Sequence, residues 1–541
     1  MLEPLVKLPA NATVGVIGSG LSGLAFTYFL NKLRPDLSIT VINPGKHVGG
    51  WINSWNSKDQ NNDPIMIERG PRTLRSISDG TVIIMDTIKE LGKADRIKYI
   101  EKSSDANKKF IVDPRDRLVR VPNSLPSLIK FFLNPVSKGL LPGVMLEWSR
   151  KPGDPSVRDE SVHSLISRRF GNEFVSSNLM SALFRGIYSD DVKTLSARKV
   201  LRPMLEDERK YGSFTKGALA MLSNPPKPGR LTPVLSQYQR VFKKDPVELE
   251  QLSKKLKRYA MMGFQGGLST VPLSLREALD KQPNVRFIRG TVTSFVNDSN
   301  SKKIRVEYKD DATPGSVTST EFDHLRVTLV PRLLANLLKK NNGSLATKLQ
   351  KVQNNTVVLV SFYLPSKDVV PKKFRGFGYL VPESNPNPEK LLGVIFDSVV
   401  EKNFRPFIEP AGGAKQEHKE YTKLTAMVGG YMLYDKNGEC QVPSEEEAIE
   451  RVKVCLKKHL GISDADLNEG MWVYTVADKA IPRFFVGIDD WTSDVVKQIQ
   501  RDYDNKVSLG GMVFSESMGL PDVLVDGFKD AVKLGQPETE Q

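Results

Sequence analysis

The residues of clearest chemical meaning are three glycines near the N-terminus, at a spacing that binds the pyrophosphate of a dinucleotide. In this pattern Gly18 allows a tight turn, Gly20 lets the backbone approach the pyrophosphate, and Gly23 lets a helix pack closely on a strand. The N-terminus of that helix presents free N–H groups to the phosphates. The candidate phosphate-binding residues are therefore Gly18, Ser19, Gly20, Leu21, Ser22 and Gly23.

The elements around these glycines are the ones that the pattern requires. The apolar run 13–17 predicts a strand that leads into the turn. Apolar residues at helical spacing over 21–33 predict a helix, and Pro35 ends it. Residues 38–43 predict a second strand. Strand, turn, helix and strand together predict a Rossmann-like, dinucleotide-binding α/β unit.

One position departs from the usual dinucleotide site. The second strand normally ends in an acidic side chain that holds the adenosine ribose, but Asn43 stands there, followed by Pro44. An amide accepts a ribose hydroxyl without charge, so Asn43 predicts a weaker adenosine anchor, which Asn43→Glu should strengthen by about 1 kcal/mol. The position alone does not exclude a phosphorylated nicotinamide cofactor.

Four further segments favour a flavin. Two glycines and a tryptophan occupy 49–51, and 68–72 reads Glu-Arg-Gly-Pro-Arg. Far downstream, glycine-rich turns at 510–512 and 518–522 precede a predicted C-terminal helix, 523–534, whose N-terminus would face a polar flavin atom. In this order the segments resemble the FAD-dependent amine oxidase superfamily.

Composition restricts the other classes of function. The chain has 541 residues, enough for two or three domains, and a net charge of +15. That charge permits an anionic partner, but no nucleic-acid-binding motif accompanies it. Cys440 and Cys455 are the only cysteines, and the five histidines form no ligand pair, so no metal site is predicted.

The segment 122–148 is apolar but interrupted by proline, glycine and lysine, with apolar residues from Leu125 to Trp148. Two interpretations stay open: a buried helical pair, or a surface that lies in a membrane interface without spanning it. No apolar run is long enough for a transmembrane helix. The N-terminus has neither a secretory nor a convincing transit signal.

The order of the segments predicts a discontinuous cofactor domain. We expect an α/β (overall α+β) protein with a Rossmann-like FAD-binding domain, a mixed-sheet substrate domain and a helical membrane-binding domain. The predicted boundaries are 1–100, 259–335 and 470–541 for FAD binding, 101–258 for the helical domain, with an insertion, and 336–469 for the substrate domain.

Five sequence strings make the resemblance more specific. They are GPRTLR at 70–75, FRGIY at 184–188, RGFGYLVP at 375–382, LLGVIFDS at 391–398 and IPRF at 481–484. In this order they resemble the protoporphyrinogen oxidase family over almost the full length, and most of all its fungal mitochondrial members.

The resemblance implies an activity and a location. The activity is oxidation of protoporphyrinogen IX to protoporphyrin IX by O2, with H2O2 formed, in the penultimate step of haem synthesis. The location is the intermembrane-space side of the mitochondrial inner membrane, peripherally bound and dimeric. Because the flavin carries the redox chemistry, no catalytic side chain is expected. No cysteine or suitable histidine accompanies the late glycine turn, so the FAD is predicted to be noncovalent.

The resemblance also implies residue roles. Beyond the turn at 18–23, the FAD-lining residues would be Asn43, Trp51, Gly70, Pro71, Arg72, Thr73, Val292, Met512, Met518, Gly519 and Leu520. The substrate-binding residues would be Lys109, Gly186, Phe377, Leu380, Phe396 and Met427. Lys109 and His47 stand where arginine is common in the family. Lysine offers a point charge rather than a fork to a propionate, and Arg185 is a second candidate for that contact.

Two other functions remain open from the sequence. The first is another enzyme of the same superfamily, an amine oxidase or a carotenoid-type desaturase. The second is a flavoprotein without redox activity that serves as a binding module. A porphyrinogen-oxidation assay discriminates among the three.

Overall fold

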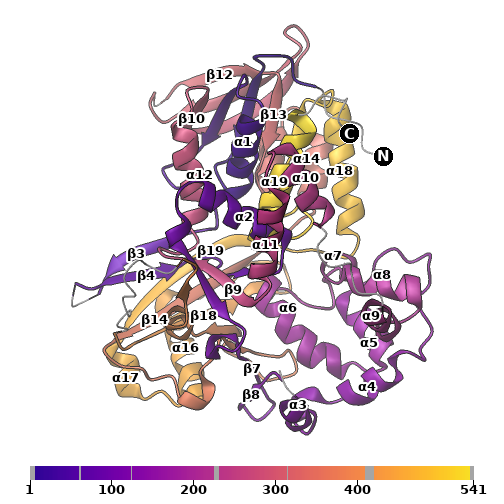
Figure 1. Ribbon diagram of the computed structural model, residues 1–541, viewed down its shortest axis with the longest axis vertical. Coiled ribbons are helices and arrows are strands. Elements are labelled where there is room, and N and C mark those ends of the chain that lie inside the picture. The colour runs from indigo at the N-terminus through magenta and orange to yellow at the C-terminus, as the bar shows by residue number, and fades with distance from the viewer. Residues whose placement is uncertain are drawn as a thin grey trace.

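The predicted Rossmann-like unit forms the upper part of the protein in a computed structural model that describes residues 7–59, 62–122, 125–223, 231–313, 315–408 and 419–535 (Figure 1). Its seven-stranded sheet has the order β12-β11-β10-β2-β1-β13-β20. The strands are β1 (Thr13–Ile17), β2 (Ser38–Asn43), β10 (Val285–Asp298), β11 (Lys303–Asp310), β12 (Val317–Phe322), β13 (His324–Val327) and β20 (Val507–Leu509). In this order β10, β2, β1, β13 and β20 pair parallel, whereas β11 pairs antiparallel with both β10 and β12.

Helices from both ends of the chain cover this sheet. The buried helix α1 packs along the C-terminal helix α19, so the first and last elements share one core. The helices of this core are α1 (Leu21–Leu33), α2 (Asp79–Glu90), α10 (Pro233–Val241), α11 (Pro246–Leu256), α12 (Thr270–Asp280) and α19 (Leu520–Gly535). The other face carries α13 (Pro331–Leu338), α14 (Gly343–Leu349) and α18 (Ile488–Asp502).

A second seven-stranded sheet, of order β19-β14-β18-β16-β15-β7-β8, forms the lower left part (Figure 1). All its pairs are antiparallel except β15 with β7. The strands are β7 (Lys109–Val112), β8 (Leu118–Arg120), β14 (Asn354–Pro365), β15 (Gly378–Leu380), β16 (Leu391–Ile395), β18 (Tyr421–Gly429) and β19 (Met471–Pro482). The helices α15 (Asp397–Lys402), α16 (Glu445–Leu460) and α17 (Asp464–Glu469) accompany it.

Two small sheets lie with these large ones. The first has the order β17-β6-β9-β5, and the second is the pair β3-β4. Their strands are β3 (Ser54–Lys58), β4 (Pro64–Glu68), β5 (Leu74–Arg75), β6 (Ile97–Glu101), β9 (Tyr259–Phe264) and β17 (Arg405–Pro406). The domain boundaries predicted from the sequence stay a prediction. The helices α10 and α11 lie within 101–258, the range predicted for the helical domain, but they contribute to the Rossmann-like core.

A helical lobe occupies the lower right (Figure 1). It consists of α3 (Leu125–Phe132), α4 (Leu140–Glu147), α5 (Val162–Phe170), α6 (Ser181–Tyr188), α7 (Ala197–Val200), α8 (Arg202–Tyr211) and α9 (Phe214–Ser223). The side chain of Leu125 lies outside the described residues.

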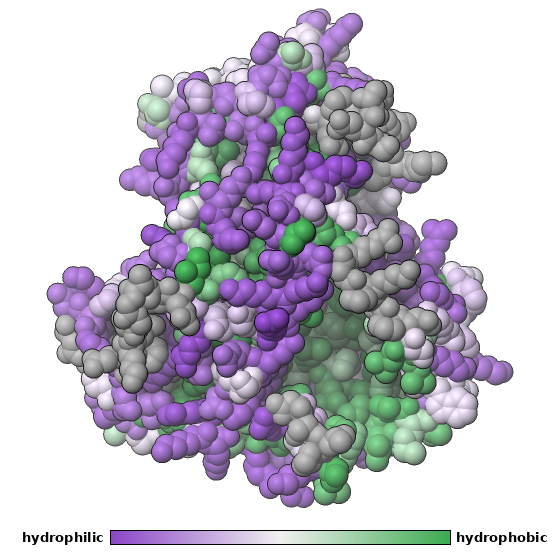
Figure 2. Space-filling model, in the orientation of Figure 1, coloured by the Kyte–Doolittle hydropathy of each residue, from purple (hydrophilic) through white to green (hydrophobic). Residues whose placement is uncertain are grey.

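Apolar side chains gather on the surface of this lobe (Figure 2). The exposed set from α3 and α4 comprises Ile129, Leu133, Leu141, Val144, Met145, Leu146 and Trp148, and α9 adds Leu219, Met221 and Leu222. Phe131, by contrast, is buried. The described side chains of 127–148 therefore form mostly an apolar surface rather than a buried pair. None of the helices in the described part of the chain is long and apolar enough to cross a membrane.

Candidate active site

The glycine turn has the geometry that its spacing predicts. Gly18 has a φ of +102°, in the left-handed region that favours glycine. A Cβ at Gly23 would lie 2.1 Å from the carbonyl oxygen of Gly18, so only glycine lets α1 approach the end of β1 this closely. At Gly20 the nearest atom to such a Cβ is the Gly50 Cα, 3.9 Å away. Gly23 thus serves packing, whereas Gly20 leaves open space.

The start of α1 fits a phosphate ligand. Gly20 is its N-cap, no side chain among the described residues caps it, and its first turn contains no acidic residue. The buried hydroxyl of Ser22 has no hydrogen-bond partner in the described structure. Helix N-termini leave N–H groups unsatisfied and carry partial positive charge, so this turn suits an anion.

Asn43 at the end of β2 holds the glycine turn. Its Oδ1 accepts the Ser19 N–H at 3.1 Å, and its Nδ2 donates to the carbonyl oxygens of Pro44 at 2.9 Å and His47 at 3.3 Å. All three bonds are within the protein. A carboxylate could replace only the first of them, because it has no N–H to donate.

The segments 49–51 and 70–73 meet beside this turn. The backbone of Gly49 forms a bridge with Gly20, and a Cβ at Gly70 would collide with the carbonyl oxygen of Trp51. Trp51 is 40% exposed. Segments that are separate in the chain thus form a single cluster in space.

Arg72, predicted to line FAD, makes a buried link to the second sheet. Its Nε donates to Asp397 at 2.6 Å, and its two terminal nitrogens donate to the carbonyl oxygens of Gly70 and Glu68. The Thr425 hydroxyl donates to the other oxygen of Asp397 at 2.7 Å. The side chains of the ion pair are each 8% exposed. Sequence reasoning missed this pair because its partners lie 325 residues apart.

Glu68, four residues before Arg72, is held in the same region. Its carboxylate accepts the Leu268 N–H and the Ser54 hydroxyl, both at 2.8 Å. Burial raises the pKa of Glu68, and these two bonds act in the opposite direction. The carboxylate therefore joins the cofactor segment to the turn at 266–268.

The late glycine turn reaches the same edge of the sheet. The Gly510 N–H donates to the Val327 carbonyl at the end of β13, next to β1. Met512, Met518 and Gly519 are partly exposed, and Gly519 precedes α19. Val292 lies on β10, three residues beyond the pairing of Arg289 with Asn43. Carboxyl ends of parallel strands are where such sheets bind ligands.

Three of the predicted substrate-binding residues gather on one face of the second sheet. A Cβ at Gly186, on α6, would collide with the Leu380 side chain, so these two residues are in direct contact. Met427 of β18 pairs with Gly393 and lies on the same face as Lys423, whose ammonium donates to the Met66 carbonyl. This face, the Met427 face, therefore meets the cofactor-binding half of the protein.

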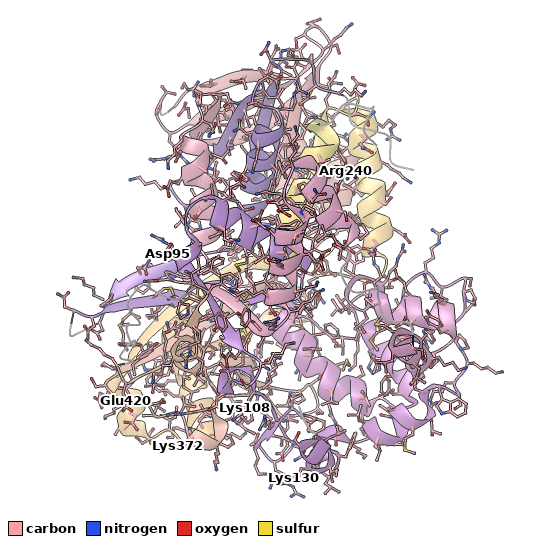
Figure 3. The ribbon with its side chains drawn as sticks, viewed as in Figure 1. Asp95, Lys108, Lys130, Arg240, Lys372 and Glu420 are labelled. Atoms are coloured by element: carbon pink, nitrogen blue, oxygen red, sulfur yellow. The ribbon has the colours of Figure 1, made fainter. Side chains whose placement is uncertain are left out.

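Lys109 lies on the same face, at the start of β7, the strand next to the edge strand β8. The parallel pairing of β7 with β15 places Lys109 beside Gly378 and Ile111 beside Leu380. Lys109 is exposed, and Figure 3 shows its neighbour Lys108 in the lower part of the molecule. Phe377 is half-buried and packs in a cluster with Met261 and Ile100, close to the segment of Thr73, whose hydroxyl contacts Met261.

Phe396 lies on the opposite face. It is fully buried and packs on Tyr379, with ring centroids 5.9 Å apart. Because side chains alternate along a strand, the Met427 face receives its neighbour Ile395 instead. The structure thus places Phe396 in the core of the second sheet, facing away from Met427, and its substrate role stays a prediction.

Arg185 is a buried cation beside Gly186. Its guanidinium donates to the Tyr431 hydroxyl, and its Nε has no partner among the described residues. Burial raises the pKa of Tyr431 to about 12, although the neighbouring Arg185 acts to lower it. No group of three or more potential metal ligands occurs in the described part of the chain.

Known proteins resemble the chain in sequence and in fold. Residues 16–91 match the NAD(P)-binding Rossmann-like domain family. Protoporphyrinogen oxidase of Saccharomyces cerevisiae is 47% identical over 546 residues, covering 99% of this chain and 100% of that protein.

Two solved structures share the fold. A proposed protoporphyrinogen oxidase from Exiguobacterium sp. 255-15 superimposes with a TM-score of 0.68 and 17% identity, covering 97% of this chain and 100% of that one. Cyclohexylamine oxidase from Brevibacterium oxydans IH-35A gives a TM-score of 0.59 and 14% identity, covering 97% and 99%. These identities show the fold alone, whereas the full-length identity to the yeast enzyme shows the family: the chain belongs to the protoporphyrinogen oxidases.

Proposed function

We propose that the chain oxidises protoporphyrinogen IX to protoporphyrin IX, with noncovalent FAD as cofactor, O2 as electron acceptor and H2O2 as product. This is the penultimate step of haem synthesis. The observation that carries the proposal is 47% identity over almost the whole chain to an enzyme of that name. When bound, FAD supplies a two-electron acceptor that O2 regenerates, so three rounds aromatise the macrocycle.

The FAD would lie across the carboxyl ends of β1 and β13. Its pyrophosphate would meet the N-terminus of α1, with Gly20 leaving room and the unpartnered Ser22 hydroxyl close by. Asn43 acts on the adenosine side by fixing the Ser19 backbone, and Val292 lies farther along that side. Trp51, Thr73 and Met512 would flank the flavin end.

The substrate would lie between the flavin end and the Met427 face of the second sheet. Leu380 and Met427 offer apolar walls there. Phe377, in the separate cluster with Met261 near Thr73, would add an aromatic wall from the cofactor side. Lys109, exposed at the start of β7, would attract a propionate. Gly186 would offer its carbonyl oxygen to a pyrrole N–H.

The role of these side chains is orientation rather than acid–base chemistry. A reduced tetrapyrrole loses hydrogen from its bridging carbons without a nucleophile or metal, provided that one carbon is held against the oxidant. Apolar walls that fix a large ring and exclude water contribute through proximity. Arg72 contributes indirectly, since its bond to Asp397 joins the cofactor segment to the substrate sheet.

Porphyrin fluorescence tests the proposal directly. The flavin-loaded protein should convert freshly reduced protoporphyrinogen IX to fluorescent porphyrin under air and consume O2. Coproporphyrinogen III, which carries four carboxylates, and a set of primary amines serve as comparison substrates. The proposal fails if flavin-loaded protein gives no porphyrin above the uncatalysed rate, or if it oxidises an amine with a higher kcat/KM.

We further propose that the protein binds the mitochondrial inner membrane peripherally, on the intermembrane-space side, as a homodimer. The exposed apolar side chains of α3, α4 and α9 support contact with a membrane (Figure 2). Leu133 is 82% and Leu222 is 77% exposed, which is costly in water unless another surface covers them. Separation of mitochondrial compartments and analytical ultracentrifugation test the location and the dimer.

A further inference from the structure

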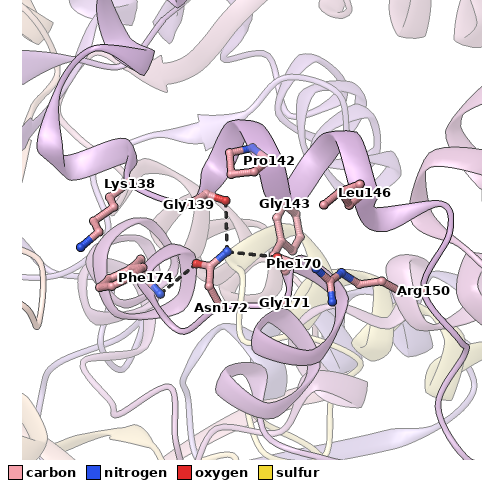
Figure 4. Close-up of a pocket in the computed structure, with 10 residues that line it drawn as sticks. All are labelled: Lys138, Gly139, Pro142, Gly143, Leu146, Arg150, Phe170, Gly171, Asn172 and Phe174. Atoms are coloured by element: carbon pink, nitrogen blue, oxygen red, sulfur yellow. Dashed lines mark hydrogen bonds between the residues drawn. The ribbon is translucent and has the colours of Figure 1, made fainter.

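The helical lobe contains a cavity of about 330 Å3 between α4 and the end of α5 (Figure 4). Its walls are apolar, formed by Pro142, Leu146, Phe170 and Phe174, and two cations, Lys138 and Arg150, complete the lining. Figure 4 shows these cations at opposite ends of the group of lining residues. The Rossmann-like site and the Met427 face contribute none of the lining residues.

Neither cation has a carboxylate partner in the described structure. The Lys138 ammonium lies 3.9 Å from the centroid of the Phe174 ring. Arg150 lies against the backbone of Gly171, and its buried Nε has no hydrogen-bond partner among the described residues. An arginine N–H that is buried without an acceptor costs free energy, and an anion that supplies the acceptor removes that cost.

The buried carboxylates of the lobe are already paired with other arginines. Glu147, on the same helix as Leu146, binds Arg169 and accepts the Ser213 hydroxyl at 2.7 Å. Glu208 binds Arg168 at 2.5 Å. These carboxylates therefore leave the charge of Lys138 and Arg150 uncompensated, and the cavity favours an anion.

The cavity also opens onto the exposed apolar surface of the lobe. Leu146 and Phe174 line the cavity and are themselves 52% and 43% exposed. Met145 on the same helix, and Trp148 directly after it, continue this surface. A ligand that fills the cavity and follows its opening must be anionic at one end and apolar at the other.

We propose that this cavity binds the phosphate headgroup of an anionic glycerophospholipid. The phosphate would lie against the Arg150 guanidinium, with Lys138 at the other end of the lining, and an acyl chain would follow Leu146 onto the apolar surface. The planar guanidinium of Arg150 suits two phosphate oxygens, and Lys138 adds a point charge. The proposal rests on the proposed membrane contact and goes further, because it assigns one saturable site rather than a diffuse attraction to anionic lipid.

Short-chain lipids below their critical micelle concentration test the site without a bilayer. Isothermal titration of FAD-loaded protein with dihexanoylphosphatidic acid should give one site. Lys138→Gln/Arg150→Gln should weaken the affinity about tenfold or more, since each cation near an anionic headgroup contributes about fivefold. Dihexanoylphosphatidylcholine, whose choline repels the cations, should bind more weakly than phosphatidic acid to the unmodified protein.

A matched control removes the same charge elsewhere. Lys130→Gln/Lys216→Gln neutralises two exposed lysines on α3 and α9, and Figure 3 places Lys130 at the lower end of the lobe. This control should bind phosphatidic acid as tightly as the unmodified protein. Flavin content and circular dichroism should match in all three proteins, which shows that each variant is folded.

Several outcomes overturn the proposal. The first is no saturable binding of phosphatidic acid to the unmodified protein, and the second is an equal loss in the control variant, which indicates diffuse attraction. Inorganic phosphate that binds as tightly as the lipid makes the cavity a free-phosphate site. Porphyrin formation is measured separately, so a failure of the proposed oxidase activity can be told apart from a failure of lipid binding. Flotation on neutral liposomes tests the membrane contact independently of the headgroup site.

Discussion

Gly20 and Gly23 are both parts of one glycine pattern, but the structure gives them different physical roles. A Cβ at Gly23 would lie 2.1 Å from a backbone oxygen, whereas a Cβ at Gly20 would meet no protein atom closer than 3.9 Å. Gly23→Ala should therefore disturb the packing of α1 on β1 with or without FAD. Gly20→Ala should leave the flavin-free protein intact and obstruct only the pyrophosphate.

The two substitutions differ in expected magnitude. A carbon–oxygen contact needs about 3.2 Å, so Gly23→Ala forces a backbone shift of about 1 Å, and overpacking of this kind costs up to ~3 kcal/mol. Alanine returns at most ~1 kcal/mol through its helix propensity. The net loss in unfolding free energy is about 2 kcal/mol. For Gly20→Ala we expect a change within about 0.5 kcal/mol in the flavin-free protein and at least a tenfold loss of FAD affinity, the effect of about 1.4 kcal/mol.

Denaturant unfolding of flavin-free protein and FAD titration separate these effects. Flavin is removed, the first unfolding transition is followed by tryptophan fluorescence, and FAD affinity is measured by fluorescence quenching. Ser22→Ala removes the unpartnered hydroxyl without adding volume, so it should lower FAD affinity less than Gly20→Ala does. If Gly20→Ala lowers the stability of the flavin-free protein as much as Gly23→Ala does, or binds FAD normally, the assigned division of roles is refuted.

Three other predictions concern cofactor, substrate and membrane. Asn43→Glu should weaken FAD binding by about 1–2 kcal/mol rather than strengthen it, because a carboxylate cannot replace the two donated bonds; tighter binding by titration would contradict this. Phe377→Ala should retain FAD but lower kcat about 10²-fold, whereas Lys109→Ala should mainly raise KM about fivefold, and normal turnover in Phe377→Ala would place the substrate elsewhere. Met145→Ser/Trp148→Ser should reduce liposome flotation at unchanged flavin content, and loss of flavin together with solubility would show that these side chains are structural.

The cofactor-binding unit could be predicted closely because its signals are local. The strand Thr13–Ile17, the helix Leu21–Leu33 and the strand Ser38–Asn43 begin and end where the sequence predicts. Each boundary depends on neighbouring residues: a glycine turn, a proline after the helix, and an apolar run of strand length. The longer strand Val285–Asp298 is harder to recognise as one element, because Gly290 interrupts its apolar pattern.

For the second sheet, the face on which each side chain lies was harder to predict, because it depends on strand register. An irregular pairing between Leu391 and Gly393 sets which residues of β16 face Met427. That register directs Ile395 toward the Met427 face and Phe396 into the core, although an aromatic residue looks the better wall for a flat ring. A similar limit applies to α9, whose apolar side chains indicate a surface only once the packing of the lobe is known.

The Arg72–Asp397 pair joins two halves of the candidate site that lie far apart in the sequence. Arginine after Gly70 and Pro71 suggests a cofactor contact when only the local sequence is considered. In the fold, Asp397 accepts from both Arg72 and Thr425, so one buried carboxylate connects the segment beside the glycine turn to the strand that carries Met427. Removing one partner of a buried pair leaves the other charge uncompensated and costs about 3–5 kcal/mol. A contact between distant segments therefore joins the proposed cofactor side to the proposed substrate face. Changes at Arg72 are expected to shift the Met427 face relative to the glycine turn even where FAD still binds.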